Sequence, residues 1–477
     1  MYSLPLLNQL DKPKYLQLAD ALRSAIRQGQ LQPGERLVSA RSLAESLTLN
    51  RHTVMNALQL LVAEGWLASQ ERSGYVVEAS LPIESSRGSA SMPQFNPIVP
   101  TFAQPLSLPK APPHLSYDYH FGGGLPDLQL FPYSSFRRML AEACLHRELG
   151  HFHYSEVAGV NALQLQVLAY LRRARALNYQ EVLICNGSQE ALYLVAKAFL
   201  REGDEVAMEN LGYPPAKKAF ASFGARLRGI PQDEQGICTQ ALKNVLSEGK
   251  VRLLYLTPLH QYPTTVTLSP ARRLEVYQLC YQHGVFIVED DYDHEFHYAC
   301  QPLRPLAADD PAGIVIYLST FSKLMFAGAR TGYICASEHV LPQLVALKQL
   351  LNHKNDAVMQ LAIAKWMAKG EFERHLRKMT KLYHARRDAM VNELGQWQRQ
   401  GKIKQFTIPD GGMALWVDSG IDVRGLAQQA AKLGVFIQTE EEFLLAPEHL
   451  PTHIRLGFAG QSSERAKQGL AQLMTLL

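Results

Sequence analysis

The sequence contains little cysteine, and its cysteines are far apart. None of the six has the Cys-x-x-Cys spacing of a zinc or redox site. They are Cys144, Cys185, Cys238, Cys280, Cys300 and Cys335. In a chain of 477 residues this pattern favours reduced, mostly buried thiols, so we expect neither a disulfide framework nor a metal site.

Long hydrophobic runs are also absent. No uninterrupted apolar segment approaches the roughly 20 residues that cross a bilayer. The first residues, MYSLPLLNQLDKPKY, lack the basic start, the apolar stretch and the cleavage site of a signal peptide. We therefore expect a cytoplasmic protein that makes no contact with a membrane.

A large excess of charge of one sign is missing as well. The net charge is +4, and residues 1–80 contain eight Lys/Arg and seven Asp/Glu. Binding of nucleic acid would therefore have to depend on where the basic residues lie. What the chain does have is length and a hydrophobic fraction of 47%, which are enough for two or three domains with sizeable cores.

Residues 1–80 contain three helical patterns and then a hairpin. The first helix is indicated by apolar residues at helical spacing, with Gly29 placed to end it. These residues are Tyr15, Leu18, Ala19, Leu22 and Ile26. Ser39 and Asn50 can cap a second and a third helix, and the extended pieces LASQ and YVVE flank residues 71–74. This order predicts a winged helix-turn-helix.

Residues 81–116 have a different composition. Eight of the chain's 26 prolines fall in this segment, mixed with serines, and no hydrophobic period is present. Because proline fixes φ and lacks an N–H, such a segment does not build a core of its own. We expect a semi-rigid linker that lets two domains move independently.

In residues 117–477, helical and apolar segments alternate. Helical patterns cover 159–176 and 188–201, and short apolar runs lie between helices. The runs are VLIC (182–185), EVAM (205–208), LLYL (253–256), VFIV (285–288) and IVIYL (314–318). The alternation predicts an α/β domain with a parallel sheet covered on both faces. Ligands of such sheets bind at the carboxyl ends of the strands, where the polar motifs of this chain fall.

Two of these motifs are open to several interpretations. Residues 186–189, NGSQ, follow VLIC and open a helix, so they either bind an anion such as phosphate or form an ordinary turn. Residues 289–293, EDDYD, follow VFIV. Clustered carboxylates at a strand end repel one another unless something compensates them. A metal, a protonated ring nitrogen and a solvated acidic loop are the three alternatives.

A third motif, STFSK, ends at Lys323, and Arg330 follows seven residues later. A lysine at a buried strand end can have a lowered pKa and attack an aldehyde, whereas an isolated lysine is more often a surface residue. The three motifs taken together favour a reactive lysine over a surface lysine. A phosphate site, a carboxylate and a lysine amine together match the phosphate, ring nitrogen and aldehyde of pyridoxal 5'-phosphate (PLP).

Residues 117–477 resemble fold type I aminotransferases. Together with YLQLADALRSAIRQGQLQPGERL near the N-terminus, the chain resembles the MocR subfamily of GntR-type regulators. The resemblance implies that Lys323 binds PLP covalently, Asp290 pairs with its ring nitrogen, Tyr292 reaches the ring hydroxyl and Tyr213 stacks on the ring. The phosphate would be bound by Ser322, Arg330 and the amides of Ser188 and Gln189.

Two further matches concern other partners. Tyr154 in HYSEVAG matches a tyrosine that reaches the phosphate of the neighbouring subunit's site, which implies a head-to-tail dimer. Arg455 in HIRLGFA matches the arginine that binds a substrate carboxylate. One segment departs from the aminotransferase pattern, because Tyr262-Pro263-Thr264-Thr265 replaces Asn-Pro-Thr-Gly. The departure argues against efficient general transamination more than against cofactor binding.

At the N-terminal end, VSAR and TLNRHTV resemble the GntR signature, which implies contacts to double-stranded operator DNA. The residues implied are Arg41, Asn50, Arg51, His52, Thr53, Arg72 and Gly74. Recognition helices contact base edges with their first turn, although any one of these residues could instead belong to a solvated polar face. The GntR pattern usually has proline where Val38 stands and glycine near Thr48, so the turn can differ in detail.

Two functions compete. The first is a transcription regulator whose aminotransferase-like domain senses PLP, with or without an amino acid. The second is a working aminotransferase that carries a DNA-binding domain. The winged helix and the missing asparagine favour regulation. A third alternative, a DNA-binding scaffold whose second domain is inactive, is disfavoured because the main cofactor contacts are retained.

Overall fold

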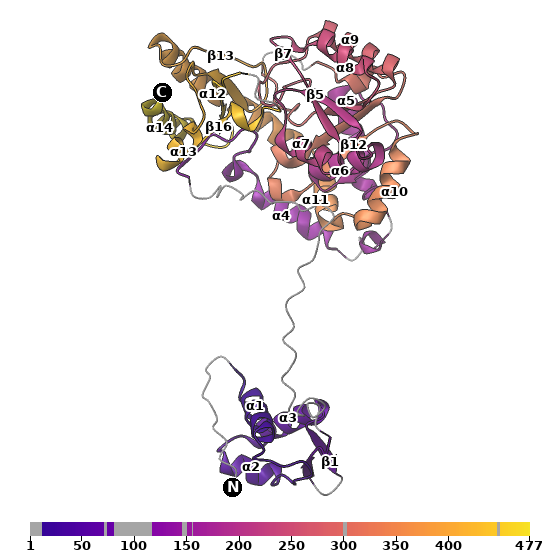
Figure 1. The fold of residues 1–477 in the computed structure, drawn as a ribbon, viewed down its shortest axis with the longest axis vertical. Helices are drawn as coiled ribbons and strands as arrows, with labels where there is room; N and C mark the ends of the chain where they lie inside the picture. The colour runs from indigo at the N-terminus through magenta and orange to yellow at the C-terminus, as the bar shows by residue number, and fades with distance from the viewer. Residues whose placement is uncertain are drawn as a thin grey trace. The chain divides into compact units, whose positions relative to one another are not determined.

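The computed structural model describes residues 12–70, 74–80, 117–145, 150–154, 156–298, 303–445 and 449–477. Contacts divide the chain into two units, Met1–Pro109 and Lys110–Leu477. Figure 1 shows both as ribbons coloured along the chain. No helix in the described ranges is long and apolar enough to span a membrane.

The first unit is a winged helix-turn-helix, as predicted. It consists of α1 (Lys14–Arg27), α2 (Ala40–Ser46), α3 (Arg51–Ala63) and an antiparallel pair, β1 (Leu67–Gln70) and β2 (Gly74–Val77). The Ser39 hydroxyl accepts the amide of Ser42 at 3.1 Å, and Asn50 Oδ1 accepts the amide of His52 at 2.8 Å. These bonds satisfy free N–H groups at the starts of α2 and α3.

Apolar faces of the three helices and the wing meet in one small core. Its fully or nearly fully buried members include Leu18, Leu22, Val54, Leu58, Leu61 and Trp66. Gly29 follows α1 with a φ of +73°, the left-handed conformation that ends a helix and that glycine adopts at little cost. The packing of the three helices therefore depends on residues within this unit, close together in the sequence.

The second unit is built on a seven-stranded sheet in the order β4-β12-β11-β10-β9-β5-β6. Five strands fall on the five predicted apolar runs: β4 (Leu183–Cys185), β5 (Glu205–Glu209), β9 (Val251–Leu256), β10 (Phe286–Asp290) and β11 (Val315–Thr320). The other two are β6 (Arg226–Ile230), which is partly polar and lies at the edge, and β12 (Gly332–Cys335).

One strand departs from the expected parallel arrangement. β12 pairs antiparallel with both β11 and β4, while the other neighbours in the sheet are parallel. The chain reaches β12 directly after the connection at 321–331, which turns back beside β11, whereas a parallel strand would need a long crossover. The prediction of a parallel sheet is therefore confirmed for the other strands and wrong for β12.

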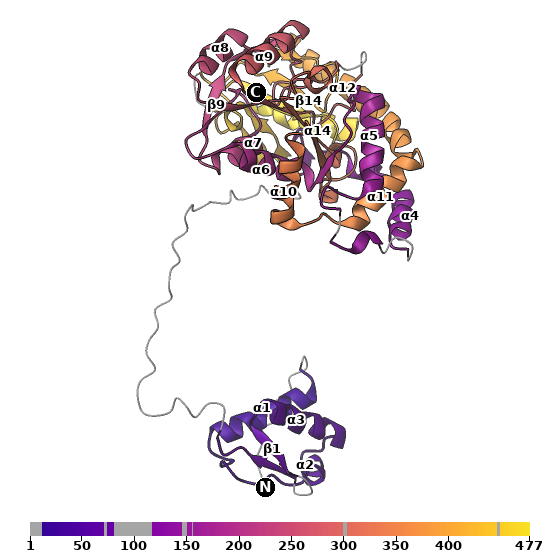
Figure 2. The ribbon, with the colours of Figure 1, turned by 90° about the vertical axis from the view of Figure 1, so that its right-hand side faces the viewer.

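Helices cover both faces of the sheet, and alternate strand residues point to opposite sides. One buried cluster joins the sheet to α6 (Gly187–Phe199), α7 (Pro214–Ala221) and α10 (Leu341–Asn352). The other joins it to α5 (Asn161–Arg175), α8 (Thr239–Ser247), α9 (Pro270–His283) and α11 (Ala357–Ala368). Figures 1 and 2 show α6 beside α7 and α10 in both views.

A second, four-stranded sheet follows the long helix α12 (Glu371–Arg399). Its order is β13 (Gln405–Thr407), β14 (Ala414–Asp418), β17 (His453–Gly457) and β16 (Gln438–Thr439). α13 (Leu426–Lys432) contacts β16, and α14 (Ser463–Leu473) contacts α12. The remaining α-helix and strands of the described residues are α4 (Tyr133–Ala143), the pair β3 (Tyr119–His120) with β15 (Val435–Phe436), and the pair β7 (Gln232–Asp233) with β8 (Gly236–Ile237).

Candidate functional site

A cavity of about 340 Å³ lies where strands of the large sheet end. It brings together eight of the residues predicted to bind PLP. They are Ser188, Gln189, Tyr213, Asp290, Tyr292, Ser322, Lys323 and Arg330. Tyr255, Thr257, Tyr262, Thr320 and Ala327 complete the lining.

Lys323 ends the short 3-10 turn Phe321–Lys323 that follows β11. Its amine donates a hydrogen bond to the carbonyl of Gly124 at 2.8 Å. Burial lowers the pKa of Lys323 to about 8, although the charges of Asp293 and Asp290 oppose that shift. A larger fraction of the amine is therefore unprotonated near neutral pH than in an exposed lysine, which is the state that attacks an aldehyde.

Asp290 is the last residue of β10 and is buried at the bottom of the cavity. One carboxylate oxygen accepts the hydroxyl of Tyr255 at 2.9 Å, while Oδ1 has no hydrogen-bond partner among the described residues. Burial raises the pKa of Asp290 to about 7. A buried acceptor without a donor is costly, and a protonated ring nitrogen would satisfy both its charge and its hydrogen bond.

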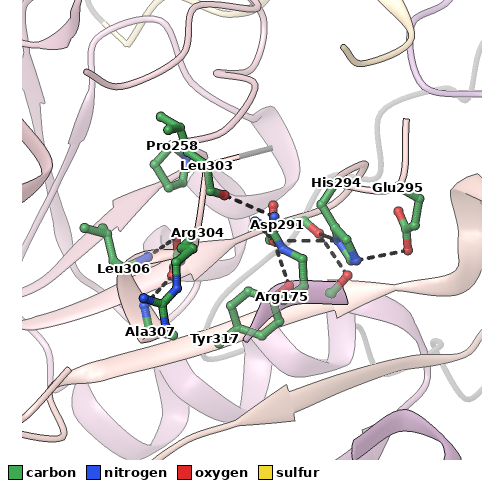
Figure 3. Close-up of polar contacts among 12 residues, drawn as sticks. Arg175, Pro258, Asp291, His294, Glu295, Leu303, Arg304, Leu306, Ala307 and Tyr317 are labelled. Atoms are coloured by element: carbon green, nitrogen blue, oxygen red, sulfur yellow. Dashed lines mark hydrogen bonds and ion pairs between the residues drawn. The ribbon is translucent and has the colours of Figure 1, made fainter. Parts of the chain in front are cut away.

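The other carboxylates of the EDDYD run have partners inside the protein. Glu289 accepts the amides of Leu306 and Ala307 at 2.8 and 3.0 Å. Asp291 pairs with Arg175 at 2.7 Å and accepts the hydroxyl of Tyr317 at 2.7 Å, as Figure 3 shows.

These contacts decide between the three interpretations of the acidic run. All four of its carboxylates are at most 3% exposed, so it is not a solvated loop. No cluster of metal-ligating side chains occurs among the described residues. Of these four carboxylates only that of Asp290 lines the cavity, and this arrangement fits a single cationic ring nitrogen.

One end of the cavity is built from the start of α6 and from Arg330. Gly187 has a φ of +74°, and a Cβ there would lie 2.9 Å from Arg330 Nη2. The guanidinium donates to the carbonyl of Asn186 at 2.8 Å. The free amides at the start of a helix and a nearby guanidinium both favour an anion, so a phosphate fits here.

A buried polar group behind this end was not predicted. Lys348 is completely buried and lies 3.7 Å from Glu190, and it donates to Asn355. Asn355 in turn donates to the side chain of Asn186 at 2.8 Å. The one local signal was a lysine on the apolar face of α10, in the sequence LPQLVALKQLLN.

Arg455 lies in β17 and is 1% exposed. Its Nε donates to the carbonyl of Pro263 at 3.3 Å, its guanidinium lies 4.3 Å from the ring centroid of Tyr262, and Nη1 has no partner among the described residues. A Cβ on Gly123 would overlap Nη1. Arg455 thus has an unused donor next to a lining residue of the cavity, where a carboxylate can be bound.

The segment that replaces Asn-Pro-Thr-Gly is ordered by Gln261. Its side chain donates to the carbonyl of Leu211 at 2.6 Å and accepts the amide and hydroxyl of Thr264 at 2.9 and 2.6 Å. Thr265 has a φ of +66°. A threonine in this conformation is strained, which explains why glycine suits the position. Thr48, also noted as a replaced glycine, has a φ of +54°.

Tyr154 does not belong to the cavity. It is 86% exposed, and its ring lies 5.8 Å from that of His353. The next residue, Lys354, donates to the carbonyl of His151 at 2.6 Å and pairs with Glu156 at 3.2 Å. The exposed tyrosine is therefore held on an anchored loop, and its contact with a neighbouring subunit stays a prediction.

In the first unit, the predicted DNA residues lie at or near the starts of α2 and α3. Arg51 and His52 are exposed in the first turn of α3, Thr53 is partly exposed, and Asn50 is occupied as the cap. Arg41 is exposed and pairs with Glu45 at 3.1 Å.

The wing residues are described only in part. Gly74 opens β2 with a φ of +91°, and Arg72 lies outside the described residues.

Fold and sites together define a DNA-binding winged helix joined to an aminotransferase-type domain. Residues 14–77 match the bacterial regulatory proteins of the gntR family, and residues 138–473 match aminotransferase class I and II. The chain belongs to the aminotransferase class I and II family in its MocR form, the GntR-type transcriptional regulators that carry this domain.

Similar proteins agree with this assignment. The HTH-type transcriptional regulator YdeL of Bacillus subtilis strain 168 is 30% identical over 98% of both chains. The probable rhizopine catabolism regulatory protein MocR of Rhizobium meliloti is 31% identical over 80% of this chain and 77% of its own. The crystal structure of Pyrococcus horikoshii kynurenine aminotransferase aligns with a TM-score of 0.70 at 29% identity, covering 76% of this chain and 90% of that one.

Proposed function

We propose that the winged helix of this regulator binds operator DNA and that the aminotransferase-like unit binds PLP, with or without an amino acid, as the effector. The observation that carries the proposal is that one cavity contains both the Lys323 amine and a buried Asp290 oxygen, which has no hydrogen-bond partner in the part of the chain that the structure describes. The Gly187–Arg330 anion site at the other end supports it.

The predicted site residues have distinct roles in this proposal. Lys323 binds the aldehyde covalently, and Asp290 holds the ring nitrogen in its protonated form. The phosphate is bound by Ser322, Arg330 and the amides of Ser188 and Gln189. Tyr213 packs on the ring, Tyr292 orients its hydroxyl side, and Arg455 binds the effector carboxylate. When bound, the protonated ring withdraws electrons from whatever is attached to it.

The test measures DNA binding as a function of cofactor. A duplex selected by the protein from a random pool is titrated at one salt concentration with apo protein, PLP-loaded protein and the Lys323→Ala variant. If PLP and DNA both differ in affinity for two arrangements of the protein, each must change the affinity of the other by the same factor. Three superimposable curves would rule out PLP sensing.

A second function, transamination, is supported by a separate observation. The pKa of Lys323 is lowered to about 8, and Arg455 keeps an unused donor, as a working aminotransferase requires. Against it stands the segment Tyr262–Thr265, which lacks the asparagine. Incubation of PLP-loaded protein with amino acids distinguishes the two, because sensing changes the visible spectrum without a keto acid product and catalysis releases one.

We also propose a head-to-tail homodimer in which Tyr154 reaches the phosphate of the neighbouring site. Its high exposure on a loop held by Lys354 supports this. Mixed dimers of Tyr154→Phe and Lys323→Ala subunits test it. Their one Lys323-containing site faces the unaltered Tyr154 of the Lys323→Ala subunit, so it should bind PLP more tightly than the sites of Tyr154→Phe homodimers.

For domain boundaries, we assign residues 1–80 to the DNA-binding domain, 81–116 to a Pro/Ser-rich linker and 117–477 to the PLP-binding domain. Limited proteolysis would test this assignment, since cleavage should begin within 81–116.

A further inference from the structure

The first half of α12 concentrates positive charge on its exposed face. Residues 374–387 contain six Lys/Arg and no Asp/Glu, whereas the whole chain has a net charge of +4. Four of the six are exposed and follow the helical spacing i, i+3, i+4 and i+7, so they share one face. We call Arg374, Arg377, Lys378 and Lys381 the α12 basic stripe.

Basic residues around the stripe have acidic partners, whereas the stripe has none among the residues that the structure describes. Arg386 pairs with Asp127 at 2.7 Å, Arg387 with Asp388 at 2.8 Å, and Arg173 with Glu373 at 2.9 Å. Within the described ranges, no carboxylate forms an ion pair with any member of the stripe. Like charges one turn apart on a helix repel, so an external anion beside the stripe would be bound favourably.

The opposite face of α12 fixes the stripe in place. Phe372, Met379, Tyr383 and Met390 are buried in the core of the second unit. Figures 1 and 2 show α12 at the surface of this unit. The four cations therefore project from a rigid element, and little ordering is needed when they bind a partner.

We propose that the α12 basic stripe binds the phosphate backbone of the DNA duplex whose bases the winged helix contacts. This inference rests on the proposed function, which supplies the duplex. From Arg374 to Lys381 the helix rises by about 10 Å, and duplex DNA carries one negative charge per about 1.7 Å of its axis. Several phosphates can therefore face the stripe.

Two further considerations favour DNA over an acidic protein surface. The positive charge of residues 1–80 is almost balanced by negative charge, so the winged helix supplies little of the electrostatic attraction that DNA binding usually needs. Because both units belong to one chain, the second contact is intramolecular once the winged helix has bound. The stripe contributes affinity without sequence preference, since phosphates are alike in every sequence.

The test uses the full chain and a matched pair of double variants. Arg377→Gln with Lys381→Gln removes two charges from the stripe, and Arg399→Gln with Lys402→Gln removes two exposed charges at the far end of α12. Neither pair lines the PLP cavity. Affinity for the selected duplex and for a scrambled duplex is measured over a range of salt concentrations.

We expect the stripe variant to lose affinity for both duplexes by the same factor. Its slope of log K against log salt should fall by about 1.8, because each phosphate contact contributes about 0.9. The control variant should keep the wild-type slope. Equal salt slopes for the wild type and the stripe variant overturn the inference. An equal loss of DNA affinity in the stripe variant and the control variant overturns it as well. If the wild-type protein selects no duplex from the pool, the proposed function itself fails.

Discussion

His260 Nδ1 lies 2.7 Å from Asp293 Oδ1 in the interior, and the main-chain carbonyl of the same histidine accepts the hydroxyl of Tyr292 at 3.0 Å. A Cβ on Gly411 would lie 2.5 Å from His260 Nε2, so the backbone packs directly against the pair. The pair thus fixes Tyr292, and Asp293 also acts electrostatically on Lys323. Neither His260 nor Asp293 was predicted as a site residue.

Asp293→Asn should lower the pKa of Lys323 further below its ordinary value. The negative charge of Asp293 stabilises the ammonium form and raises this pKa, so its removal favours the free amine. The measurement is the rate of covalent PLP attachment to apo protein as a function of pH, and the profile should shift to lower pH. Glu209→Gln is the control and should leave the profile in place, because burial raises the pKa of Glu209 to about 8 and the replacement removes little charge near neutral pH.

Asp290→Asn should stabilise the apo protein at pH 8 and have little effect near pH 4. The folded-state pKa of about 7 lies above the ordinary value of 3.8, so the wild type loses stability as pH rises between these values. The asparagine can still accept from Tyr255 but carries no charge. The gain could reach about 4 kcal/mol at full ionisation.

Urea unfolding of apo protein at several pH values checks this effect. A pH-independent difference between Asp290→Asn and wild type would contradict it. The same variant should bind PLP more weakly, because the protonated ring nitrogen would lose its counter-charge.

Lys323→Ala should abolish the link that borohydride reduces between protein and PLP while leaving the fold intact. Lys217→Gln is a matched control, because burial lowers the pKa of Lys217 to about 8 as well, yet that residue does not line the cavity. The label should stay on the control at wild-type level. Peptide mapping that found PLP on a different lysine in Lys323→Ala would show the site to be misplaced.

Thr265→Gly should stabilise the second unit by up to about 1 kcal/mol. It removes the strain of a β-branched residue in the left-handed region, which exceeds the entropic cost of glycine. Thr264→Gly should have the opposite sign, because Gln261 Oε1 would lose the hydroxyl that donates to it at 2.6 Å. Urea unfolding of both variants provides the comparison, and the same sign for both would refute the strain argument.

Arg51→Ala should weaken binding to the selected duplex by about 1–3 kcal/mol if Arg51 contacts a base edge. If it contacts a phosphate instead, the loss should be similar for selected and scrambled duplexes, and the salt slope should fall by about 0.9. Affinities measured over a range of salt concentrations separate the two modes. Wild-type affinity at every salt concentration would remove Arg51 from the DNA contacts.

Much of the fold could be predicted because its signals are local. The apolar runs located β4, β5, β9, β10 and β11, and the motifs at their ends converge on one cavity, as strand direction requires. β6 was missed because RLRGI is partly polar, as an edge strand allows.

Long-range pairings left no such signal. Arg175 and Asp291 are 116 residues apart, and neither sequence neighbourhood indicates the other. Because these partners could not be foreseen, the sequence alone could not single out Asp290 from the other carboxylates of the EDDYD run.

The reversed direction of β12 has a consequence for where this domain tolerates insertions and deletions. Thr320 pairs with Gly332 across the two strands, and the amide of Phe321 donates to the carbonyl of Thr331 at 2.9 Å, so residues 321–331 form one closed connection. Lys323 and Arg330 both belong to it. An insertion or deletion of a single residue between them would displace the lysine proposed to bind PLP from the arginine proposed to bind its phosphate, whereas a similar change in an outer loop would not. Among related chains, the length of this connection should therefore vary less than its composition.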